Sequence, residues 1–149
     1  MKTFLILIVV LAVLAAAGLL LLAKHSRGMT PEIGLINGQL TPCQHSSNCV
    51  ISSASDQISP LVFTGKSEDA WVDVLNAIEA LGGTVEQQLD NYMWATFSTP
   101  IMGFVDDVEL LMDSEKQIFH IRSASRIGRS DFGVNRQRIE AIKLHLNNN

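Results

Sequence analysis

The sequence predicts an α+β domain that follows an N-terminal transmembrane or signal helix. Three observations support this fold class. Residues 3–23 are apolar and uncharged, residues 67–81 repeat apolar side chains at helical spacing, and three strand-like runs follow. The runs are separated by short turns, which favour an antiparallel meander. We therefore expect a three-stranded antiparallel meander flanked by two helices that pack on one face of the sheet.

The apolar segment is long enough to cross a membrane. About 20 apolar residues in a helix span the roughly 30 Å of a bilayer's hydrocarbon core. A cleaved signal peptide usually has an apolar stretch of only about 7 to 15 residues, followed by small residues. Ala15, Ala16 and Ala17 would supply small residues, but residues 19–22 continue the apolar run beyond them. The sequence thus favours an uncleaved anchor over a signal peptide for residues 1–24.

The rest of the chain is interpreted as a linker, residues 25–41, and a single α+β domain, residues 42–149. The linker is polar and contains several glycines. The positive charges do not show which end of the anchor faces the cytoplasm. Lys2 and the terminal amine precede the apolar segment, and Lys24 and Arg27 follow it, so the two sides are almost equally positive. The net charge of −4 and the lack of a basic motif with interleaved aromatic residues argue against nucleic-acid binding.

Two helices are expected in the domain. The first covers residues 67–81, with Ser67 as its N-cap and acidic residues in its first turn. The second covers residues 135–146, with Asn135 as its N-cap. The apolar residues expected in the core are Ala70, Trp71, Val74, Leu75, Ile78 and Leu81 from the first helix, and Ile139, Ile142 and Leu146 from the second.

The strands are expected at residues 84–98, 103–112 and 117–128. A turn centred between Ser114 and Glu115 sets the register of the second hairpin. On its core face the facing pairs are Val108 with Ile121, Leu110 with Phe119, and Met112 with Gln117. On the opposite face they are Asp107 with Arg122, and Glu109 with His120. Facing opposite charges stabilise such a pair by about 0.2–1 kcal/mol.

Asp106 is an exception on the core face, where it would oppose Ser123. A buried carboxylate needs hydrogen bonds or a cation. We expect its partners to be serine hydroxyls, loop amides or an arginine that folds back from residues 126–136.

Cys43 and Cys49 lie close together in a polar segment, with His45 between them. A disulfide is the simplest outcome in an oxidising compartment. Two free thiols are an alternative, and so is a metal site that includes His45. The spacing matches no standard zinc pattern and a fourth ligand is missing, so neither a metal nor a cofactor is expected.

Residues 122–136 are rich in arginine, serine and glycine. They could bind a phosphate or carboxylate through hydroxyls, guanidinium groups and a helix N-terminus. The alternative, which we favour, is an internal network with Asp106, Asp107 and Asp131. Arg122 and Arg126 would lie about 13 Å apart along an extended strand, too far to bind one small anion together. The sequence contains no recognisable catalytic motif.

Three segments of the chain resemble known motifs. Residues 42–53 resemble the opening motif Cys-Pro-x-Ser-Pro-Asn-Cys-Val-Ser-Ser, with departures at Gln44, Ser47 and Ile51, and residues 104–109 and 122–136 match later signatures. Together they resemble the domain of unknown function 1499 family over about residues 40–146. The resemblance implies no reaction, but similar proteins often carry an export signal or lipid anchor. The resemblance also implies which positions are important, namely Cys43, Asn48, Cys49, Asp106, Asp107, Glu109, Arg122, Ser123, Ser125, Arg126, Gly128, Asp131, Asn135 and Arg136.

These observations lead to three hypotheses about function. The first is a single-pass domain of the cell inner membrane that faces the periplasm and binds a partner protein or an anionic ligand. The second is an enzyme of unassigned class that uses Asp106 or Asp107 with arginine assistance. The third is a structural accessory subunit of a membrane complex. The candidate ligand-binding residues are Arg122, Ser123, Ser125, Arg126, Asp106, Asp107, Asp131, Asn135 and Arg136.

Overall fold

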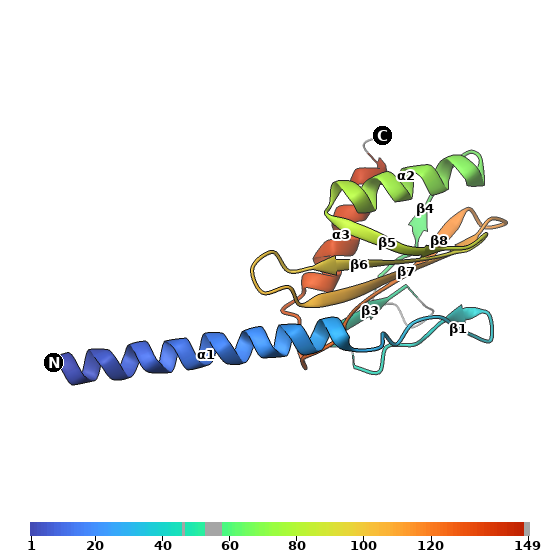
Figure 1. The fold of residues 1–149 in the computed structure, drawn as a ribbon. Helices are drawn as coiled ribbons and strands as arrows, with labels where there is room; N and C mark the ends of the chain where they lie inside the picture. The colour runs from blue at the N-terminus through green and yellow to red at the C-terminus, as the bar shows by residue number, and fades with distance from the viewer. Residues whose placement is uncertain (46, 53–57, 148–149) are drawn as a thin grey trace.

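The protein is described by a computed structural model that covers residues 1–45, 47–52 and 58–147. A long helix, α1 (Lys2–Gly28), leads into an antiparallel sheet that carries two further helices (Figure 1). The other elements are β1 (Leu35–Ile36), β2 (Gln39–Leu40), β3 (Cys49–Ile51), β4 (Leu61–Val62), α2 (Ser67–Ala80), β5 (Gly83–Gln88), β6 (Tyr92–Ser98), β7 (Val105–Asp113), β8 (Ile118–Ser125) and α3 (Val134–Asn147). The α+β class and the N-terminal apolar helix are confirmed.

The prediction of a three-stranded meander is wrong, because the main sheet of the described chain has six strands. Five of them follow the order β3-β8-β7-β6-β5. The sixth strand, β4, also pairs with β8, at Ile118 and Phe119, whereas β3 pairs with residues 122–124 of β8. Residues 84–98 form two strands instead of one, since Asp90 and Asn91, common turn residues, separate β5 from β6. The strands β3 and β4 lie in a serine-rich segment with only two or three paired residues each, too short to give a strand pattern.

The register of the β7–β8 hairpin differs from the prediction by two residues. Asp113 faces Ile118, so the loop has four residues rather than two. The Asp113 carboxylate accepts a hydrogen bond from the Lys116 backbone N–H at 3.0 Å, and Gln117 has a φ of 54°. Arg122 consequently faces Glu109 instead of Asp107. A shift of two residues leaves every side chain on its predicted face.

One face of the sheet packs against α2 and α3 and contains the main core (Figure 1). Trp71 of α2 meets Phe119 of β8 edge-on, with ring centroids 4.7 Å apart. Most of the expected apolar stripe is buried, but Leu81 is exposed and Ala77 is buried in its place. Ser67 is not an N-cap, because Lys66 precedes the helix in that position and no side-chain cap bond forms.

The opposite face of the sheet is also covered. The segment 25–41, interpreted above as a linker, contains the end of α1 and the small β1–β2 hairpin. Leu40 of this hairpin joins Ile51, Tyr92 and Leu111 in a second apolar cluster. Asp107, Glu109 and Arg122 on this face are therefore buried rather than exposed to solvent.

The end of α1 is attached to the domain, while the rest of the helix projects away from it (Figure 1). Ser26 Oγ accepts a hydrogen bond from the Val105 backbone N–H at 3.1 Å. Arg27 Nη1 donates to the carbonyl of Gly103 at 3.2 Å. The apolar part of α1 has a mean hydropathy of 3.3 and is not buried by the domain. Its length and composition are those of a single-pass membrane anchor or a signal sequence.

Gly83 begins β5 next to Ile78 of α2 and Phe97 of β6. A Cβ atom at this position would lie 2.6 Å from Phe97 Cζ and 2.7 Å from Ile78 Cγ2. We expect Gly83→Ala to lower the free energy of unfolding by about 1–3 kcal/mol through overpacking. Urea unfolding followed by tryptophan fluorescence measures this change. Gly28→Ala, where a Cβ would meet nothing within 4 Å, is the matched control and should cause no loss.

Candidate functional site

The three sequence motifs converge on a small pocket of about 240 Å³ on the second face of the sheet. The sheet brings them together, since β3 pairs with β8 and β8 with β7. The pocket is lined by Met29, Thr30, Glu32, Gln44, His45, Asn48, Cys49, Asp107, Arg122, Ala124, Ser125, Arg126 and Gly128. A larger depression of about 800 Å³ lies near the β7–β8 loop, and no candidate ligand-binding residue lines it.

One wall of the pocket is an ion pair between Asp107 and Arg126. Arg126 donates from Nε to Oδ2 and from Nη2 to Oδ1, both at 2.8 Å. Trp94 Nε1 also donates to Oδ1, at 2.9 Å. Hydrogen bonding to Asp107 raises the pKa of the Arg126 guanidinium. This parallel two-bond geometry holds both side chains in place.

A second ion pair, between Glu109 and Arg122, lies deeper. Arg122 Nη1 donates to Glu109 Oε2 at 2.7 Å, and Glu109 is completely buried. The other carboxylate oxygen accepts bonds from the Tyr92 hydroxyl at 2.8 Å and the Gly34 backbone N–H at 2.6 Å. The predicted pairing of Glu109 with His120 is wrong. His120 Nδ1 lies 3.1 Å from the Ser52 carbonyl oxygen instead.

Arg122 retains an unused donor. Its side chain is 4% exposed, and its buried Nε has no hydrogen-bond acceptor among the residues that the structure describes. A guanidinium offers five N–H donors and no acceptor. Leaving a buried donor without a partner costs about 1–3 kcal/mol.

The carboxylate of Asp106 is on the other face of the sheet, where Arg138 of α3 binds it at 2.6 Å. An arginine partner was expected, but Arg138 lies just beyond the segment 126–136 that was considered. Arg138 also donates to Asn135 Oδ1 at 2.7 Å and lies over the Phe97 ring, 4.8 Å from its centroid. The three-residue spacing of Asn135 and Arg138 on a helix could have indicated their contact.

Asn135 is buried in the first turn of α3 and is not an N-cap. Asp131 caps this helix, because its carboxylate accepts the backbone N–H groups of Gly133 at 3.0 Å and Asn135 at 2.8 Å. Burial alone would raise the pKa of Asp131, but these hydrogen bonds outweigh it and hold the pKa below its usual range. Asp131 therefore stabilises the start of the helix.

The nine candidate residues thus do not form one site. Four of them, Asp107, Arg122, Ser125 and Arg126, line the pocket. Asp106, Ser123 and Asn135 form a separate cluster with Arg138, Asp131 caps α3, and Arg136 is exposed. No local sequence pattern marks Tyr92, Trp94 or Glu32 as part of the site, since their contacts come from distant segments.

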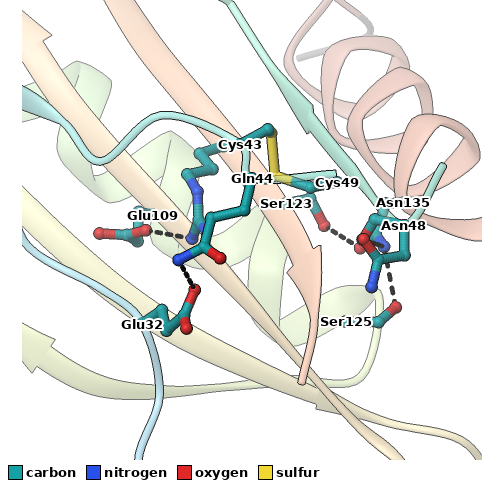
Figure 2. The surroundings of a disulfide bond; sticks show 10 residues. Glu32, Cys43, Gln44, Asn48, Cys49, Glu109, Ser123, Ser125 and Asn135 are labelled. Carbon is teal, nitrogen blue, oxygen red and sulfur yellow. Dashed lines mark hydrogen bonds and ion pairs between the residues drawn. A yellow bond between two sulfur atoms is a disulfide. The ribbon is translucent and has the colours of Figure 1, made fainter. Parts of the chain in front are cut away.

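A disulfide joins Cys43 and Cys49, with a Cα–Cα distance of 5.6 Å. Both sulfurs are bonded, so the free-thiol and metal alternatives do not apply to this structure. Figure 2 shows Glu109 on one side of the disulfide loop and the Asn135 cluster on the other. The Gln44 amide beside the disulfide donates to Glu32 at 2.9 Å. The loop thereby forms the outer wall of the pocket.

Tyr92, the single tyrosine of the chain, provides a test of the buried charges. Burial, together with the negative charge of Glu109, raises the pKa of its hydroxyl far above the usual range. The free energy of unfolding should be unaffected below pH about 10 and fall above it, by at most about 1.4 kcal/mol per pH unit, because only the unfolded state releases the proton. Measuring the free energy of unfolding of the wild type and of Tyr92→Phe at alkaline pH separates the contribution of the Tyr92 hydroxyl from that of the lysines. If the two proteins lose stability equally above pH about 10, the raised pKa of Tyr92 is contradicted.

Comparison with known proteins adds one finding. A family model described as "Protein of unknown function (DUF1499)" matches residues 39–146. No curated protein and no solved structure matches the chain. The matched range includes the three motifs and the elements from β2 to α3 that surround the pocket.

Proposed function

Since the chain belongs to the DUF1499 family, whose description assigns no activity, we propose its function from the geometry of the site. We propose a domain anchored in the inner membrane by α1 that faces the periplasm and binds a small anionic group in the pocket beside Arg122. The anionic group is a carboxylate or a phosphate. The disulfide supports an oxidising compartment, since such bonds persist outside the cytosol.

The unused donor of Arg122 is the observation that carries this proposal. Arg122 lines the pocket, its Nε is buried, and no described residue accepts from it. Arginine binds carboxylates and phosphates through charge-assisted hydrogen bonds. A pocket of about 240 Å³ is smaller than sites for drug-sized ligands, so it suits a single such group.

Arg122 differs from Arg126 in its unused donor, since each of the two is paired with a carboxylate. Both nitrogens of Arg126 that face Asp107 are already hydrogen-bonded to it, so this pair contributes almost no net charge. Glu32 is exposed at the rim, and within the described part of the chain its partner is the neutral Gln44. Glu32 opposes an incoming anion, and Glu32→Gln should therefore bind it more tightly than the wild type.

The geometry does not favour acid–base catalysis by Asp106 or Asp107. Each carboxylate is ion-paired with an arginine at 2.6–2.8 Å. A general acid or base must exchange its proton with the substrate. The arginine donors already occupy carboxylate oxygens that a substrate would have to reach.

The proposal is tested by nuclear magnetic resonance of the arginine Nε–H groups in the full chain in detergent micelles. Inorganic phosphate and acetate are titrated separately, with chloride at equal ionic strength as the control. We expect a saturable shift of the Arg122 Nε–H resonance, which is assigned by its loss in Arg122→Lys. The Arg126 Nε–H, already bonded to Asp107, is the internal control and should not follow. An Arg122 resonance that responds to neither anion beyond the chloride control would refute the proposal.

A further inference from the structure

Two exposed apolar side chains lie at the end of the domain from which α1 leaves. Ile101, in the β6–β7 loop, is 89% exposed, and Phe132, in the loop before α3, is 92% exposed. In Figure 1 both loops lie at that end of the sheet. Arg126, which begins the second loop, donates from its backbone N–H to the Val105 carbonyl, and its side chain contacts the Met29 carbonyl at 3.5 Å. The two loops therefore share a position beside the end of α1.

The attachment of α1 determines how far this end lies from the membrane. Arg27 binds the carbonyls of Met102 and Gly103, next to Ile101. The apolar run ends at Ala23, and four residues of helix rise only about 6 Å. The headgroup layer on each side of a bilayer is about 5–8 Å thick. Ile101 is thus at the depth of the headgroups when α1 spans the membrane.

The conformation of Phe132 is unusual for an exposed residue. Its φ of 53° is in the left-handed region, which is rare and strained for a bulky side chain. The carboxylate of Asp131, which precedes Phe132, accepts hydrogen bonds from the backbone N–H groups of Gly133 and Asn135, which follow it. The loop thereby presents a phenyl ring to the exterior in a fixed position. Such a ring packs favourably at the boundary of headgroups and acyl chains.

The charges around Phe132 fit a phosphate-rich surface. Arg129 and Arg136 flank it in the sequence and are exposed. Asp131 is the single acidic residue between positions 123 and 139, and its carboxylate is engaged by backbone N–H groups. Lys24 is exposed on the last turns of α1. Basic side chains next to apolar ones are typical of surfaces that bind the membrane interface.

We propose that Ile101, Arg129, Phe132 and Arg136 form a membrane-facing rim that docks on the headgroup layer of the bilayer that α1 enters. The rim holds the domain against the lipid and adds to the attachment at the end of α1. This inference is independent of anion binding by Arg122, because its residues and its measurement differ from those of the pocket.

The experiment uses the full chain reconstituted in phosphatidylcholine vesicles, with or without phosphatidylglycerol. Ile101→Cys and Phe132→Cys are labelled with an environment-sensitive fluorophore, and both native cysteines are in the disulfide and do not react. Glu115→Cys is the control, since its loop is at the opposite end of β7, about 30 Å away. Nitroxide groups on the lipid heads should quench positions 101 and 132 several-fold more than position 115. Quenching at either position no stronger than at 115 would overturn the rim.

A measurement without labels covers the case in which a cysteine variant misfolds. Trypsin should cut after the exposed Lys116 at similar rates in the wild type and in the double variant Ile101→Asp with Phe132→Asp. Cleavage after Arg129 in vesicles should be several-fold slower in the wild type, because the rim is shielded by lipid. Equal rates of cleavage after Arg129 in the two proteins would also overturn the inference.

Discussion

Glu109→Ala is expected to lower the free energy of unfolding by about 3–5 kcal/mol, because removing one partner leaves the other charge of a buried pair uncompensated. Glu109 is completely buried and accepts hydrogen bonds from Arg122, Tyr92 and Gly34. Alanine would leave all three donors without their acceptor. It would also release the segment around Gly34 that covers this face of the sheet. The effect should therefore exceed that of an average core substitution.

Urea unfolding of the full chain in detergent, followed by the fluorescence of Trp71 and Trp94, measures this loss. Glu79→Ala on the exposed side of α2 is the matched control and should change the free energy of unfolding by less than about 0.5 kcal/mol. The double variant Glu109→Leu with Arg122→Met should recover most of the loss, since apolar pairs often replace buried ion pairs without penalty. A single variant that unfolds like the control would show that the pair is not buried in solution.

Asn135→Ala is expected to cost about 3 kcal/mol or more, since several buried polar groups would lose their partners together. The Asn135 side chain accepts bonds from Ser123 Oγ at 2.5 Å and from Arg138. It donates to the Asn48 carbonyl at 3.1 Å and to Ser125 Oγ at 3.0 Å. These four contacts join β8, α3 and the loop before β3. No smaller side chain can satisfy all of them.

The same unfolding measurement tests this prediction. Asn76→Ala, on the exposed face of α2, is the control and should be neutral or slightly stabilising, because alanine has the higher helix propensity. Asn135→Asp keeps the size of the side chain but replaces its donor with an oxygen opposite the Asn48 carbonyl. It should therefore also destabilise the domain. Stability equal to the wild type in both Asn135 variants would exclude this residue as a structural link between the three segments.

The sequence by itself determined the features that depend on neighbouring residues. The long uncharged run predicts α1, and the helical spacing of Ala70, Trp71 and Val74 predicts the buried side of α2. Alternation along β7 and β8 assigns Asp106 and Asp107 to opposite faces, as observed. The short spacing of Cys43 and Cys49 favours the disulfide that forms. In each case the information lies within a few residues of the element concerned.

Only the tertiary structure decided which residues face one another across long distances in the sequence. The register of β7 and β8 depends on the left-handed backbone at Gln117, which no apolar pattern records. The short strands β3 and β4 exist because β8 offers them a hydrogen-bonding edge. Glu109 and Arg122 are buried because residues 29–44 fold over them. Hydrogen bonds and burial of this kind depend on segments that meet only after folding, and local propensity does not encode them.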